Sequence, residues 1–208
     1  MRQLILKMSM SVDGYVGGPN GEIDWIFKAY DTTVIDWEVA ILWQASAHVM
    51  GSRTFRDMVA YWPRSTEPFA PPMNEIPKVV FSRTGSIGQG TTTRALEDAM
   101  RVRTAAEAPA PANLSSWTSP TVATGDLTEE IAHLKQGSGK PLLAHGGASF
   151  AQNLVKAGLV DEYCLLVHPA VLGRGLPLFS GLAKPVDLKL VSATTFASGA
   201  VAHVYHPA

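Results

Sequence analysis

The chain alternates short apolar runs with segments of helical periodicity, and this alternation constrains its fold more than any other feature. The apolar runs are bounded by Gly, Pro or Ser, as buried strands are. A strand followed by a helix and a further strand is the pattern of a parallel sheet, so we predict an α/β fold. The predicted strands are Leu4–Met10, Ala47–Met50, Lys78–Ser82, Pro141–His145 and Glu162–His168.

The segments between these runs carry helical signals. In Asp31–Gln44, apolar residues recur at helical spacing behind Asp31, whose carboxylate can cap the helix. The other predicted helices are Thr54–Ala60, Leu127–Gln136 and Ala148–Ala157, which end at Pro or Gly signals.

The C-terminal fifth has a different pattern. Val186–Thr194 and Ala200–His206 are alternating runs joined by Phe196–Gly199, which predicts a hairpin that adds antiparallel strands to the sheet. The expected sheet is therefore mixed.

Residues 91–119 are rich in Ala, Pro, Ser and Thr. We interpret them as a surface insertion or a flexible loop within a single domain of residues 1–208, with a short helix at Leu96–Arg103. The strands on both sides are expected to belong to one sheet.

Composition excludes several classes of protein. Of the 208 residues, 46% are hydrophobic, which is enough for a sizeable core. Lys and Arg (17) balance Asp and Glu (18), so neither a nucleic acid nor an anionic membrane is an expected partner. The six histidines lack the i, i+4 spacing of metal ligands, so we predict no metal site.

The cysteine content and the N-terminus indicate a cytoplasmic protein. Cys164 has no second cysteine for an internal disulfide and lies in an apolar run, so we expect a buried, reduced thiol. Met1–Met10 is interrupted by Lys7 and has neither the cleavage pattern of a signal peptide nor the length of a membrane span.

Three predicted strand ends carry groups that suit phosphate. Gly146 and Gly147 follow one strand and begin a helix, Gly51–Thr54 follows another, and Ser82–Thr84 follows a third. Backbone N–H groups at a helix start bind anions, and arginine can hold a phosphate with two hydrogen bonds. Each junction alone can equally be a tight turn or a solvated surface. Together they favour a ligand with several phosphates at the carboxyl edge of the sheet.

A glycine-dense loop follows the first strand. Asp13 lies at its start and can orient a substrate or supply a proton through water, although Asp before Gly is also common in turns. Trp25 and Trp62 further along provide aromatic walls that can stack on a heterocycle or fill the core.

The order of these motifs resembles the dihydrofolate reductase-like superfamily. Within it, the chain is most similar to the branch related to the C-terminal reductase domain of the bifunctional riboflavin-biosynthesis deaminase-reductase. The resemblance covers nearly the whole chain outside residues 91–119. It rests on Ser11–Gly17 with Asp24-Trp25, Met50–Phe55, Val79–Thr84, His145–Phe150, Gly158–Glu162 and Val167–Gly175.

The resemblance implies a central eight-stranded mixed sheet and an NADPH-dependent reductase. By position, Gly51, Ser52, Arg53 and Thr54 would hold the diphosphate and adenosine side. Ser82, Arg83 and Thr84 would flank the 2′-phosphate and adenine, while Gly146, Gly147, Ala148, Ser149 and Phe150 would cradle the diphosphate. The backbone at Ser9 and Val16 would hold the nicotinamide carboxamide.

The chain departs from two family patterns. The Asp-Asp-Pro segment of the riboflavin-pathway reductases, which helps to bind the ribose phosphate, is replaced by Arg56–Pro63. The buried acid that binds the pterin in dihydrofolate reductase has only Asp31 and Asp36 as candidates, neither in clear register, and Asp31 is also a candidate cap.

We therefore predict hydride transfer from NADPH to a C=N or C=O bond of a small pyrimidine-like, pterin-like or carbonyl substrate, with Asp13 and Asp31 as candidate catalytic residues. Dihydrofolate reductase proper and a non-catalytic nucleotide-binding protein are the alternatives. The related reductases often pair as homodimers. Here Leu165–Leu172 can form such an interface, but buried sheet is the simpler interpretation.

Overall fold

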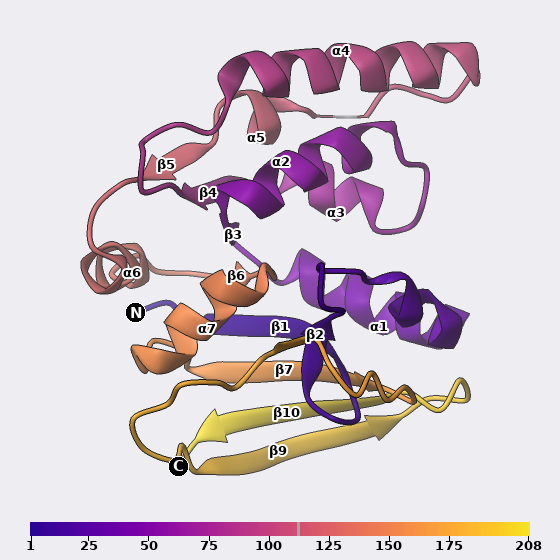
Figure 1. The fold of residues 1–208 in the computed structure, drawn as a ribbon. Coiled ribbons are helices and arrows are strands. Elements are labelled where there is room, and N and C mark those ends of the chain that lie inside the picture. The colour runs from indigo at the N-terminus through magenta and orange to yellow at the C-terminus, as the bar shows by residue number, and fades with distance from the viewer. Residues whose placement is uncertain (112) are drawn as a thin grey trace.

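The computed structural model describes residues 1–111 and 113–208 and contains one large sheet. Its eight strands lie in the order β5-β4-β3-β6-β1-β7-β10-β9, which confirms the eight-stranded expectation (Figure 1). The strands are β1 (Leu4–Ser11), β3 (Ala47–Gly51), β4 (Lys78–Phe81), β5 (Thr121–Ala123), β6 (Leu142–Ala144), β7 (Glu162–His168), β9 (Leu188–Thr195) and β10 (Val201–Pro207).

The sheet is mixed, as predicted. In the part of the sheet that runs from β5 to β7, each strand is parallel to the next one. The C-terminal hairpin is antiparallel: β10 pairs with β7 and β9 pairs with β10. Two short strands outside it, β2 (Tyr15–Gly17) and β8 (Leu176–Pro177), form a separate antiparallel pair. The sequence patterns missed β5, β2 and β8, each of which is three residues or fewer.

Helices cover the two faces of the sheet. On one face, α6 (Leu127–Lys135) and α7 (Ala148–Lys156) pack on a core that includes Leu4, Leu6 and Leu165. On the other face, α1 (Thr32–Trp43) and α2 (Ser52–Tyr61) pack on a core that includes Ile5. The same face carries α3 (Ala70–Glu75) and the 3-10 helices η1 (Asp24–Ala29) and η2 (Trp62–Arg64). Successive β1 residues therefore serve opposite cores, as the period of a strand requires.

The run considered as a dimer interface, Leu165–Leu172, is interior only in its first part. Leu165 is 3% exposed and Leu166 is fully buried, because β7 lies between β1 and β10. The buried-sheet interpretation is correct for these two residues.

The segment 91–119 contains more structure than expected. A 17-residue helix, α4 (Gln89–Ala105), extends well beyond the predicted Leu96–Arg103, and α5 (Ser115–Thr118) follows it. Ala112 lies outside the described residues. Figure 1 shows α4 and α5 at the β5 end of the sheet, opposite the β9–β10 hairpin.

Trp117 of α5 explains why part of this segment is not a loose loop. Its ring is fully buried, lies 5.6 Å from the Phe55 ring, and donates a hydrogen bond from Nε1 to Asn74 Oδ1 at 2.8 Å. Local composition does not reveal this contact, since the partners come from α2 and α3. Among the described residues, no helix is both long enough and apolar enough to cross a membrane.

Candidate active site

Two neighbouring strand ends form the centre of the candidate site. β3 and β6 are parallel, with Val49 opposite Ala144, and each runs into a helix. The glycines before these helices, Gly51 and Gly147, provide no side-chain cap for α2 and α7. The first N–H groups of both helices can therefore receive an anion at the positive end of each helix.

A side-chain hydrogen bond joins the two junctions. The Thr54 hydroxyl donates to the Gly146 carbonyl at 2.9 Å. Gly147 has a φ of +95°, and a Cβ built on it would lie 2.6 Å from Thr54 Oγ1. A Cβ on Gly146 would lie 3.2 Å from Met8 Cε. The close contacts therefore explain why this turn requires glycine.

The other residues of these two junctions have different surroundings. Arg53 is exposed in the first turn of α2, and Ser52 is half-buried beside it. Phe150 packs against Phe81 with ring centroids 5.3 Å apart, so its side chain supports the turn from the side of β4. Ala148 and Ser149 begin α7, where their backbone contributes to the helix start.

The third junction, after β4, is a compact turn with an exposed arginine. Ser82 is buried, and its hydroxyl donates to the Ser86 carbonyl at 2.7 Å. Its side chain is therefore used within the turn. Arg83 and Thr84 are exposed beyond it. Arg53 and Arg83 are thus the exposed cations that the predicted cofactor edge offers at these two junctions.

A buried polar cluster lies on the α1 face of β1, and the sequence patterns missed it. Glu38 of α1 is 1% exposed and forms an ion pair with Lys7 of β1. Its other oxygen accepts a hydrogen bond from the Tyr30 hydroxyl at 2.5 Å. Burial and the neighbouring Glu38 carboxylate raise the pKa of Tyr30. Ser9 follows Lys7 on the same face of β1, at the position predicted for the nicotinamide carboxamide.

The buried acid of α1 is Glu38 and not one of the residues that the sequence suggested. The sequence candidates were Asp31 and Asp36, but Asp36 is exposed. The sequence did contain a signal for Glu38. It lies one turn after the buried Val34, so it is an acidic residue on the side of the helix that faces the sheet.

Asp31 is a helix cap. Its Oδ1 accepts hydrogen bonds from the Val34 backbone N–H at 2.9 Å and the Thr33 hydroxyl at 2.6 Å. Its Oδ2 accepts one from the Ser198 backbone at 2.9 Å, which ties α1 to the C-terminal hairpin. Hydrogen bonds from Thr33 and Val34 lower the pKa of Asp31 to about 2. These contacts support the cap interpretation in place of the catalytic one.

Asp13 connects two loops. Its Oδ1 accepts hydrogen bonds from the Ser11 hydroxyl at 2.7 Å and the Leu172 backbone at 3.1 Å. Its Oδ2 accepts one from the Gly173 backbone at 2.7 Å. Hydrogen bonding from Ser11, Gly173 and Leu172 lowers the pKa of Asp13. The carboxylate therefore remains ionised at neutral pH and holds the loop after β7, so these contacts favour a loop-anchoring role over proton supply.

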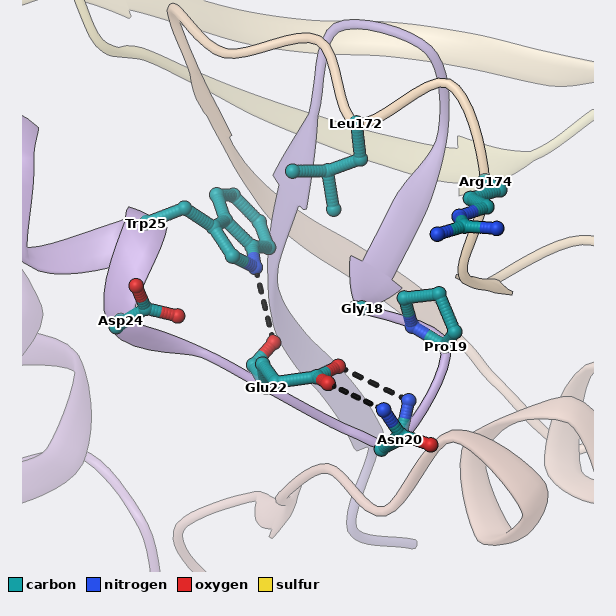
Figure 2. A pocket seen from close by; sticks show the side chains of 8 residues that line it. All are labelled: Gly18, Pro19, Asn20, Glu22, Asp24, Trp25, Leu172 and Arg174. Carbon is teal, nitrogen blue, oxygen red and sulfur yellow. Dashed lines mark hydrogen bonds between the residues drawn. The ribbon is translucent and has the colours of Figure 1, made fainter.

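The two candidate substrate tryptophans are differently placed. Trp25 lines a cavity of about 550 Å³ with Leu172, Arg174 and the 18–24 loop, and its Nε1 donates to the Glu22 carbonyl (Figure 2). Val16, another predicted cofactor contact, is buried in β2. Trp62 does not line this cavity; it packs against Tyr61 and Phe69. The structure therefore does not bring Trp25 and Trp62 to one cavity wall.

Three buried histidines lie near these groups. The rings of His48 and His145 are 4.5 Å apart, and that of His168 lies between those of Trp25 and Tyr30. Burial lowers the pKa of His145 to about 3 and that of His168 to about 4, and it lowers the pKa of His48 well below its usual value. All three are neutral at physiological pH, so the positive charge at the two strand–helix junctions comes from the helix N-termini and the exposed arginine.

Comparisons with known proteins identify the family of the chain and proteins of similar fold. The family model of the RibD C-terminal domain matches residues 2–202. The uncharacterised protein YyaP of Bacillus subtilis is 30% identical over 205 residues, which are 99% of this chain and 95% of that protein.

Two solved structures have a similar fold. One is a diaminohydroxyphosphoribosylaminopyrimidine deaminase/5-amino-6-(5-phosphoribosylamino)uracil reductase from Thermotoga maritima, with a TM-score of 0.63 and 18% identity over 100% of this chain and 57% of that chain. The other is dihydrofolate reductase from Enterococcus faecalis in complex with NADP(H), with a TM-score of 0.55 and 12% identity over 99% of this chain and 96% of that chain. Both likenesses concern the fold.

Proposed function

Because this chain belongs to the RibD C-terminal domain family, we propose that it is an NADPH-dependent reductase of a small heterocyclic substrate. The acceptor is a C=N or C=O bond of a pyrimidine-like or pterin-like compound, or of a simpler carbonyl compound. When bound, NADPH supplies the hydride from C4 of its nicotinamide. The protein supplies orientation and a water-poor pocket.

One observation carries the proposal: two parallel neighbouring strands end in helices without side-chain caps, and Thr54 holds their turns together. The arrangement gives two sets of backbone donors for the two phosphates of a dinucleotide. The glycines at 146 and 147 let this turn pack closely against Met8 and Thr54. These residues therefore fit the diphosphate of NADPH.

Charge favours NADPH over NADH. Arg53 and Arg83 are exposed at the same edge, on the junctions after β3 and β4. An additional 2′-phosphate offers these guanidinium groups a doubly charged partner. We therefore place the adenosine end of the cofactor beside β4 and the nicotinamide end beside Ser9 of β1.

The polar cluster on β1 favours a substrate other than dihydrofolate. Glu38 is the buried acid of α1, but Lys7 and Tyr30 already bind its two oxygens. A carboxylate satisfied in this way offers less to an incoming pterin than a free one. The partly buried Ser9 on the same side of β1 is the position that we assign to the reacting bond.

The experiment is a binding titration followed by a turnover assay. NADPH and NADH are titrated against the purified chain by fluorescence, and NADPH oxidation is then followed with 5-amino-6-(5-phosphoribosylamino)uracil, dihydrofolate and glyoxylate. Binding with turnover of any probe supports the proposal. Tight NADPH binding without turnover of any probe favours a nucleotide-binding protein, and absence of NADPH binding contradicts both assignments.

A further inference from the structure

We propose that the cavity between the loop 18–24 and the turn 172–174 binds a small planar ring compound that carries a carboxylate or a phosphate, and that Arg174 holds this anion (Figure 2). The cavity has a volume of about 550 Å³, within the range of about 300–1,000 Å³ that small-molecule sites occupy. The inference deepens the proposed function and rests on it for calling the ligand a substrate. Binding itself can be measured without NADPH, so the two proposals can fail separately.

The cavity lies at the same edge of the sheet as the junctions after β3 and β6. Trp25 packs edge-on against His168, the last residue of β7, with ring centroids 5.6 Å apart. The strands β3, β6, β1 and β7 are consecutive and parallel, so their carboxyl ends share one edge. Ligands of open α/β sheets bind at this edge. Since β6 and β7 are two strand spacings, or about 10 Å, apart, the strand order alone makes the cavity a neighbour of the junctions.

The backbone of Arg174 is fixed on both sides. Before it, the Gly173 backbone N–H donates to Asp13 Oδ2 at 2.7 Å. After it, Gly175 lies so close to β2 that an added Cβ would be 2.2 Å from the Gly17 carbonyl oxygen. The turn therefore presents the arginine from a rigid base. A group that is already in place loses less conformational freedom when it binds a ligand.

The guanidinium of Arg174 is available to such a ligand. The residue is exposed, and the ion pairs within residues 1–111 and 113–208 do not include it. Glu22 of the facing loop is engaged by Asn20, which donates to its carboxylate from Nδ2 at 2.6 Å and from its backbone N–H at 2.9 Å. The hydrogen bonds from Asn20 and, to a smaller extent, the charge of Arg174 lower the pKa of Glu22. A guanidinium without a protein partner offers two parallel N–H donors to a carboxylate or phosphate.

The other walls suit a planar ring with N–H groups. Trp25 is fixed because its Nε1 donates to a carbonyl of the same loop at 3.1 Å, and Leu172 and Pro19 add apolar surface. Figure 2 shows Asp24 beside Trp25, across the cavity from Arg174. A carboxylate accepts hydrogen bonds from ring N–H groups. A cation and an acceptor on opposite walls therefore favour a nitrogen heterocycle with an anionic substituent.

The test uses two pairs of probes that differ in the anion. Orotate and uracil share a pyrimidine ring, but only orotate has a carboxylate. Phenyl phosphate and phenol share a benzene ring, but only phenyl phosphate has a phosphate. Each probe is titrated into the purified chain without NADPH, and calorimetry measures its Kd. The variants are Arg174→Ala, Arg174→Lys and, as the matched control, Arg94→Ala at an exposed arginine of α4.

We expect at least one anionic probe to bind about tenfold or more tightly than its neutral partner, and the probe that does so identifies the anion. Arg174→Ala should raise the Kd of that anionic probe about 10- to 100-fold and leave the Kd of the neutral one unchanged. Arg174→Lys keeps the charge but not the paired donors, so it should restore only part of the affinity. Arg94→Ala should bind every probe as the unmodified chain does.

The proposal is overturned if neither anionic probe binds at millimolar concentration, or if Arg174→Ala binds the anionic probes as tightly as Arg94→Ala does. An equal loss for the anionic and the neutral probe would also overturn it, because Arg174 would then shape the cavity without holding an anion.

The outcomes separate this site from the reductase function. If the chain oxidises NADPH with a substrate whose KM is unchanged in Arg174→Ala, the function stands and the cavity is not the site of that substrate. If the anionic probes bind in an Arg174-dependent manner to a chain that does not bind NADPH, the site stands and the reductase function falls.

Discussion

The hydroxyl of Thr54 donates a hydrogen bond to the carbonyl of Gly146 at 2.9 Å, although the two residues are 92 positions apart. This bond connects the start of α2 with the turn before α7. It fixes the relative position of the two helix ends that we assign to the diphosphate of NADPH.

Gly147→Ala is expected to weaken NADPH binding at least about tenfold and to strain the turn by about 1–3 kcal/mol. The reason is twofold: the φ of +95° disfavours a Cβ, and that Cβ would lie 2.6 Å from Thr54 Oγ1. Fluorescence titration and thermal unfolding measure the two effects. Gly158→Ala is the control, because its φ is +64° with no atom within 4 Å of the added Cβ. Equal NADPH affinity in both variants would contradict the cradle.

Arg53→Ala and Arg83→Ala are expected to raise the Kd of NADPH about 10- to 100-fold and that of NADH much less. The difference arises because only NADPH carries the 2′-phosphate that we place at this edge. Arg101→Ala is the control, since Arg101 is exposed on α4 and pairs with Asp98. Equal losses for the two cofactors would refute the assignment of the adenosine end.

Asp13→Ala is expected to release the loop after β7. The substitution removes the acceptor for the Leu172 and Gly173 backbone N–H groups, so their amide exchange should accelerate about tenfold or more. Hydrogen exchange with mass spectrometry measures this change. Asp13→Asn keeps an acceptor oxygen and is expected to restore part of the protection. If Asp13→Ala lost activity with unchanged exchange, Asp13 would be catalytic rather than structural.

Lys78 is expected to make the chain more stable at alkaline pH. Burial lowers the pKa of Lys78 from 10.5 to about 7 in the folded state. Between these values the unfolded chain binds more protons, so the free energy of unfolding rises with pH, by up to about 1.4 kcal/mol per pH unit from this group. Urea denaturation at pH values between about 7 and 10 measures the slope. Lys78→Met should flatten it; an unchanged slope would place its origin elsewhere.

Trp117→Ala is expected to cost about 3–5 kcal/mol of unfolding free energy. The ring is fully buried against Phe55, and its removal leaves a cavity and an unpaired Asn74 Oδ1. Denaturant unfolding measures the loss. Val102→Ala, at a 50% exposed position of α4, should change stability by less than about 0.5 kcal/mol. A small effect of Trp117→Ala would contradict the core role of Trp117 and would support the interpretation of this segment as a surface insertion.

The sequence by itself determined the types of the longer elements, the mixed sheet and the two glycine-bearing junctions between a strand and a helix. Apolar runs, glycines and caps are local signals, and Asp31 capped its helix as the pattern predicted. The prediction for Gly146 and Gly147 likewise depended on neighbours in sequence, which a strand and the helix after it share.

The tertiary structure decided which polar groups meet. In the sequence, Glu38 is not distinguished from other charged residues of a helix. Only the packing of α1 on β1 reveals its ion pair with Lys7. Trp117 lies in a segment of loop-like composition, and its core role depends on Phe55 and Asn74. The physical reason is that burial and pairing are properties of side chains brought together from distant positions, whereas helix and strand preferences act within a few residues.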